Sequence, residues 1–151
     1  MNWLRCALLS SVFVALGGAQ KVDIYTADDL KSMGEALQPK GPVSAVKDLE
    51  RYRGHYFLLA KRVETGSSEL HEHDADVFVM ESGDCQIVTG GKIIGGRSTG
   101  PGEIRGRSIE GGTKHELRAG DVIHIPAGVA HQMLVKKGTP IVYFVVKVSG
   151  Q

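Results

Sequence analysis

Residues 120–131 read Gly-Asp-Val-Ile-His-Ile-Pro-Ala-Gly-Val-Ala-His. A glycine turn leads into the apolar run 122–125, which predicts a short strand, and Pro126 and Gly128 then favour a tight turn. This turn returns the chain with His131 at the start of the next strand, so it aims one imidazole at a fixed place. A plain hairpin with an incidental histidine would show the same pattern, and the stretch alone leaves both interpretations open.

Short β-rich runs separated by glycines lie on both sides of this stretch. We expect strands at 55–63, 68–73, 77–81, 85–89, 92–94, 115–118, 122–125, 132–135 and 141–148. No long helix-period pattern interrupts them, which favours an antiparallel sandwich or barrel over a parallel α/β sheet. The run 141–148 is nearly all β-formers, which predicts a strand buried on both faces, either central in the barrel or against a partner subunit.

The segment between Gly90 and Gly112 contains nine of the 20 glycines. That is too many for a regular strand pair, so we expect a long, structured loop insertion. Glu103 and Arg105 lie in this segment and could reach over the barrel mouth, where loops often determine specificity. An ordinary surface ion pair is the alternative for these two residues.

A second polar stretch, residues 69–76, reads Glu-Leu-His-Glu-His-Asp-Ala-Asp. Residues two apart in a strand point to the same face, so His71 and His73 would present two imidazoles side by side, with Glu69 on the same face. Such a pair is what a metal chelate requires. Two exposed strand histidines are the alternative interpretation.

Together the two stretches resemble the two sequence motifs of the cupin superfamily. The second motif is matched at every spacing by Gly120, Pro126, Gly128 and His131. The first motif, Gly, His-x-His, an acid and Gly, is matched by Gly66, His71, His73, Asp76 and Gly83. The match departs from the motif in two ways: the acid is Asp where Glu is usual, and the intervals before His71 and after His73 are each one residue short.

The resemblance covers about residues 42–148. It implies an all-β fold, a cupin-type jelly-roll β-barrel (double-stranded β-helix), in a small single-domain secreted protein of the cupin-2-like kind. It also implies that His71, His73 and His131 are metal ligands, and that Asp76 is the carboxylate ligand or accepts a bond from a metal-bound water; Glu69 is the alternative acid. Such a site suits one divalent transition metal ion, Fe, Mn, Ni, Cu or Zn, and is too rich in nitrogen for calcium.

The first 19 residues have the pattern of a signal peptide. Arg5 precedes an apolar run at 6–16, and small residues lead to a cleavage site near Ala19. We therefore expect a secreted or periplasmic protein, with an uncleaved membrane anchor as the alternative. The expected organisation is a signal peptide at 1–19, an N-terminal arm with a short helix at 20–41, and the cupin barrel domain at 42–151. Thr26 and Asp29 have capping-box spacing at the start of that helix, which we expect to end near Leu37.

Charge and cysteine content limit the partners. The chain carries 18 basic and 17 acidic residues, and Arg5 is the one charged residue before residue 20, so the remainder is balanced. We therefore expect no nucleic-acid partner and, after signal cleavage, no membrane partner. Cys85 would be the one cysteine left, so no intrachain disulfide is expected.

Two classes of function follow from the resemblance. One is a small-molecule metalloenzyme, because cupin enzymes include dioxygenases, isomerases and decarboxylases. The other is a non-catalytic module that binds a small molecule or a metal. The presence of a ligand set favours the enzyme slightly, but no residue stands out as a catalytic acid, base or nucleophile. Since cupins commonly pair through strands such as 141–148, we also expect a homodimer.

Overall fold

Short antiparallel strands and one helix make up residues 21–151, the part of the chain that this computed structural model describes. The helix is α1 (Ala27–Ala36). The strands are β1 (Ser44–Arg51), β2 (His55–Arg62), β3 (Ser68–His71), β4 (Asp74–Ser82), β5 (Asp84–Thr89), β6 (Lys92–Ile94), β7 (Arg97–Gly100), β8 (Glu103–Gly106), β9 (Ser108–Glu110), β10 (Thr113–Arg118), β11 (Val122–Ile125), β12 (His131–Leu134) and β13 (Ile141–Ser149).

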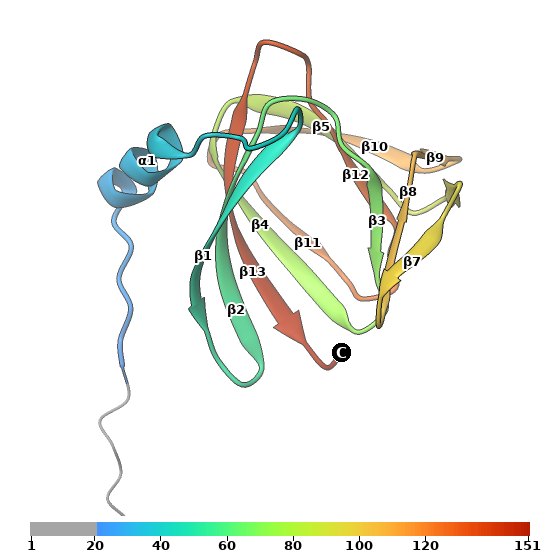
Figure 1. The fold of residues 1–151 in the computed structure, drawn as a ribbon, viewed down its shortest axis with the longest axis horizontal. Helices are drawn as coiled ribbons and strands as arrows, with labels where there is room; N and C mark the ends of the chain where they lie inside the picture. Colours follow the sequence, from blue (N-terminus) through green and yellow to red (C-terminus); the bar gives the residue numbers. More distant parts are fainter. Residues whose placement is uncertain (1–20) are drawn as a thin grey trace, which may run out of the picture.

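Two antiparallel sheets face each other around the interior of the barrel (Figure 1). The strand orders are β1-β2-β13-β4-β11 in one sheet and β10-β5-β12-β3-β8-β7 in the other, while β6 and β9 pair separately. Strands that follow one another, from β3 to β5 and from β10 to β13, alternate between the two sheets. This alternation defines a double-stranded β-helix, or jelly roll, so the predicted all-β class and barrel are confirmed.

The apolar run near the carboxyl end forms β13, which lies at the centre of the five-stranded sheet between β2 and β4 (Figure 1). Tyr143, Val145 and Lys147 face the interior. Phe144 packs on the outer face against Tyr25 and Phe57. Both faces of β13 are therefore covered within the chain, and the strand is central in the barrel, as the first of the two interpretations predicted. The homodimer stays a prediction.

The hydrophobic core lies between the two sheets, and part of it forms the floor of an open cavity. Its most deeply buried members include Met80, Ile87, Ile125 and Ile141, each at 2% exposure or less. Core residues that also line the cavity are Ala60, Phe78, Met133, Tyr143 and Val145. The core thus supplies part of the cavity wall.

The predicted capping box is present at the start of α1. Oγ1 of Thr26 accepts a hydrogen bond from the Asp29 backbone N–H at 3.1 Å, and the Asp29 carboxylate accepts one from the Thr26 N–H at 3.1 Å. The pair satisfies two N–H groups that the first turn would leave unpaired. No helix among residues 21–151 is long and apolar enough to cross a membrane. The signal peptide predicted at 1–19 lies outside the described residues.

Each predicted strand is found, with ends that differ by a few residues, but β1, β7, β8 and β9 form where no strand was predicted. The expectation of a loop between Gly90 and Gly112 is therefore wrong. Its glycines lie largely at the turns between very short strands, as at Gly91 and Gly102, whose φ values are +73° and +70°. These turns allow β7 and β8 to extend the six-stranded sheet.

Substitutions at two neighbouring glycines in the turn after β5 would distinguish the cost of backbone strain from the cost of steric overlap. Gly90 and Gly91 both have positive φ, but a Cβ at Gly90 would meet nothing within 4 Å, whereas one at Gly91 would lie 2.4 Å from the Glu110 carbonyl oxygen. We expect Gly90→Ala to cost about 1 kcal/mol from its left-handed conformation alone. Gly91→Ala should cost clearly more, because the backbone of β9 has to move. Urea denaturation of both variants measures the difference, and equal costs would contradict the described turn.

Candidate metal centre

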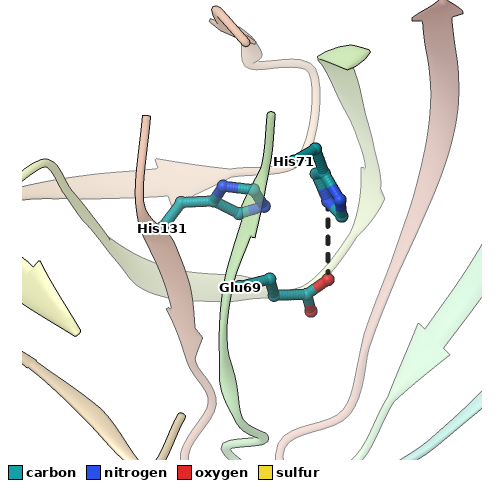
Figure 2. Close-up of side chains that lie close together, drawn as sticks. All are labelled: Glu69, His71 and His131. Atoms are coloured by element: carbon teal, nitrogen blue, oxygen red, sulfur yellow. Dashed lines mark ion pairs between the residues drawn. The ribbon is translucent and has the colours of Figure 1, made fainter. Parts of the chain in front are cut away.

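Three side chains from two adjacent strands converge inside the barrel (Figure 2). Glu69 and His71 lie two residues apart on β3 and share its inner face, and His131 begins β12 directly opposite Glu69. Oε2 of Glu69 lies 3.7 Å from Nε2 of His71. One ligand atom from each of the three residues can be chosen so that all lie within 4.8 Å of one another, which is the separation expected of groups that could hold one metal ion.

Hydrogen bonds at the far side of each ring determine which nitrogen faces the interior. Nδ1 of His131 lies 3.1 Å from the Val129 carbonyl oxygen, which can only accept, so Nδ1 carries the hydrogen. Nδ1 of His71 lies 2.6 Å from Oε1 of Glu103 and donates to it in the same way. Nε2 of both rings therefore faces the shared space, and a neutral ring directs its Nε2 lone pair there. Partners of this kind orient histidine ligands in metal sites.

Asp76 brings a second carboxylate to the same space from the opposite sheet. Its side chain is 2% exposed, and Oδ2 lies 3.3 Å from Nε2 of His71 and 3.5 Å from Nε2 of His131. Two lone-pair nitrogens facing a buried carboxylate are unfavourable unless a cation lies among them. A proton or a metal ion meets that need, so the donor set fits a transition metal.

The pKa shifts follow from the same contacts. Burial disfavours charge on His71, but the carboxylates of Asp76 and Glu103 outweigh it and raise the pKa of that imidazole. Burial likewise disfavours the Asp76 carboxylate, but His71 and Lys147 outweigh it and lower the pKa of that carboxyl. At His131 burial dominates and lowers the pKa, which favours the neutral ring that a metal requires.

His73 is not brought to this cluster, and the predicted strand at 68–73 is wrong at its end. β3 stops at His71, and Glu72 and His73 form a bend in which His73 is exposed. The His73 carbonyl oxygen accepts hydrogen bonds from the N–H groups of Gly150 and Gln151, both at 2.9 Å. The strand ends two residues before His73, so the alternation that would place His71 and His73 on one face does not reach His73. Glu69, which was the alternative acid, occupies the neighbouring position on that face.

Glu103 and Arg105 reach the cluster because β8 pairs directly with β3. In that register Glu103 lies opposite His71 and Arg105 lies opposite Glu69. An Arg105 nitrogen is 3.0 Å from Oε2 of Glu69. Opposed pairs on one face of an antiparallel sheet contact each other, so the insertion acts as an added strand.

Sequence reasoning missed two buried cations. Nζ of Lys147 on β13 lies 2.8 Å from Oδ1 of Asp76, and a guanidinium nitrogen of Arg62 on β2 lies 3.4 Å from Oε1 of Glu69. The signal for Lys147 was its place in an otherwise apolar strand, two residues after Val145 and so on the same inner face. Arg62 gave no comparable signal, since it ends its strand.

The cluster lines a cavity of about 440 Å³ that is bounded by both sheets. Its wall on the five-stranded sheet is arranged in rows. Tyr56, Lys147 and Asp76 lie side by side in one row, and the next row is apolar, with Leu58, Val145 and Phe78. A volume of this size suits a small organic molecule.

No family model matches the chain, and no curated protein matches it in sequence. Solved structures match its fold. A conserved protein with a double-stranded beta-helix domain from Klebsiella pneumoniae gives a TM-score of 0.59 at 16% identity, over 87% of this chain and 93% of that one. The Schizosaccharomyces pombe Cnp3 cupin domain gives 0.54 at 9% identity, over 75% and 67%. Oxalate oxidase gives 0.52 at 17% identity, over 73% and 53%.

These likenesses, together with the alternating strands of the two sheets, show that the chain has the cupin double-stranded β-helix fold. The predicted resemblance to cupins is confirmed at the level of the fold. The group of Glu69, His71 and His131 inside it could hold a metal ion.

The free energy of unfolding can test whether Asp76 and Lys147 form a buried ion pair. We expect Asp76→Ala to destabilise the metal-free protein by about 3 kcal/mol, because it leaves the ammonium of Lys147 buried without its partner. Adding Lys147→Met to this variant should restore much of the loss. Urea denaturation with metal chelated gives all the values. If the double variant were less stable than Asp76→Ala, the pairing would be wrong.

Proposed function

We propose that this protein binds one divalent transition metal ion in the barrel through Nε2 of His71, Nε2 of His131 and the carboxylate of Glu69, with Asp76 as a second acid. The observation that carries the proposal is the convergence of both Nε2 atoms on two carboxylates, with each Nδ1 engaged elsewhere. Imidazole and carboxylate together suit Fe, Mn, Ni, Cu or Zn.

We further infer a small-molecule metalloenzyme, dioxygenase-like or isomerase-like, that acts outside the cytoplasm. The cavity beside the cluster supports it, as does the likeness of the fold to oxalate oxidase. When bound, the ion would supply Lewis-acid or redox chemistry at positions the protein leaves open. The chain's own groups orient the ligands, while Leu58, Phe78 and Val145 keep water from one side of the cavity. The signal-peptide pattern of residues 1–19 supports the location.

A non-catalytic binding module is the second candidate. It is favoured by one observation: among the described residues, every charged side chain of the cavity wall is engaged in an ion pair. If the protein turned over any substrate, and if this turnover required the bound ion, a non-catalytic role would be excluded.

Metal content distinguishes the ligands from the other histidines. We expect wild type, reconstituted and dialysed, to hold one metal equivalent, and His71→Ala and His131→Ala each to lose it, because each removes one nitrogen donor. His73→Ala should retain the metal, since that ring lies outside the cluster, and His124→Ala on the exposed side of β11 is the matched control. Elemental analysis measures all five proteins. Metal retained by His71→Ala would refute the site.

Glu103 should affect the metal through His71 rather than by contact. We expect Glu103→Ala to weaken metal affinity by about 10- to 100-fold, as is typical when the partner of a histidine ligand is removed. Glu103→Gln keeps an oxygen that accepts from Nδ1 and should retain most of the affinity. Titration against a competing chelator measures both, with Glu110→Ala in the same insertion as control. Equal losses in Glu103→Ala and Glu103→Gln would show that charge, not orientation, matters.

A further inference from the structure

The charged side chains that line the cavity balance one another. There are three cations and three carboxylates, Arg62, Arg105, Lys147, Glu69, Asp76 and Glu103. The two carboxylates on the Nε2 side of the histidines are already paired, Glu69 with the two arginines and Asp76 with Lys147. With neutral imidazoles, the lining therefore has no net formal charge.

A divalent ion bound in this lining would bring two positive charges without compensation. Histidine ligands have to be neutral to bind a metal, so they contribute no negative charge. Glu69 and Asp76 cannot neutralise the two charges of the ion alone, because their negative charges already neutralise buried cations. Uncompensated charge in a buried site is costly, so the occupied cavity favours a ligand that brings negative charge with it.

Lys147 is the cation best placed to meet such a ligand. Its side chain is 9% exposed and lies on the cavity wall beside Tyr56, next to the apolar row of Leu58 and Val145. An ammonium has three N–H donors, and Asp76 is the one ion-pair partner that the described residues provide for it. The remaining donors are available to an anion in the cavity. Arg105, 40% exposed at the side chain, adds a cation nearer to solvent.

We propose that the metal-occupied cavity binds a small organic acid, with a carboxylate of the ligand paired to Lys147 and its short carbon chain against the apolar row. The inference rests on the proposed metal site and names the ligand class of that site. A neutral sugar or phenol of the same size would leave the charge of the ion unbalanced.

Calorimetric titration of the zinc-occupied protein tests the ligand class. Malonate, its monoamide and its diamide are nearly equal in size and carry two, one and no negative charges. We expect affinity to fall in that order, with no binding of malonate to the metal-free protein. Zinc content measured after each titration shows whether the ligand removed the metal. Equal affinity for malonate and its diamide, or equal binding without zinc, would overturn the inference.

The variant Lys147→Met tests whether Lys147 binds the carboxylate of the ligand. It should keep zinc as tightly as wild type or more so, because a cation that repels the ion is gone, yet weaken malonate binding by at least about tenfold. Lys47→Met, an exposed lysine on β1, is the matched control and should bind malonate like wild type. Unchanged malonate affinity in Lys147→Met would overturn the assignment. Failure of wild type to take up zinc would instead refute the proposed function and this inference with it.

A second variant keeps the test decisive if Lys147→Met does not fold. Arg105→Gln removes the more exposed cation of the cavity and leaves the buried pair of Lys147 and Asp76 in place. It should retain zinc and weaken malonate by a smaller factor. Malonate bound as tightly as by wild type would then overturn the inference.

Discussion

The carboxylate of Asp76 lies between the two sheets and determines what can surround it. It faces Nε2 of both His71 and His131, and it forms an ion pair with Lys147 at 2.8 Å. A carboxylate with 2% exposure remains ionised only where cations or hydrogen-bond donors replace the water it has lost. Its neighbours therefore have to supply positive charge, whether as an ammonium, a proton or a metal ion.

The barrel tolerates this polar group because the sheet confines it to one level. Alternate residues of β2, β13 and β4 face inward, so Tyr56, Lys147 and Asp76 form a single row. The next row, with Leu58, Val145 and Phe78, is apolar. Met80 and Ile141 lie further along the same strands and are almost completely buried, although Arg62, opposite Ile141, brings one charged group back to that end. The polar row thus interacts with itself and with the cavity, while the layer below provides the hydrophobic stabilisation of the fold.

Parts of the site follow from local sequence, and parts do not. The turn at Pro126 and Gly128 has strong local preferences, so the position of His131 at the start of a strand was nearly predictable; β12 begins at that residue. Periodicity also placed Glu69 and His71 on one face. It could not show that β3 ends at His71, because the bend that follows is held by distant contacts, including those between His73 and the backbone of Gly150 and Gln151.

The contribution of the insertion depends on pairing between strands, which a single stretch of sequence does not specify. Glu103 reaches His71 only because β8 pairs with β3 in a register that places the two residues opposite each other. The turn at Gly102 helps to hold that register, since its carbonyl oxygen accepts a hydrogen bond from the N–H of Glu72 at 2.8 Å. A shift of one residue would turn Glu103 to the other face and remove the acceptor of Nδ1. The orientation of a candidate metal ligand therefore depends on the backbone of a glycine-rich segment about thirty residues further along the chain.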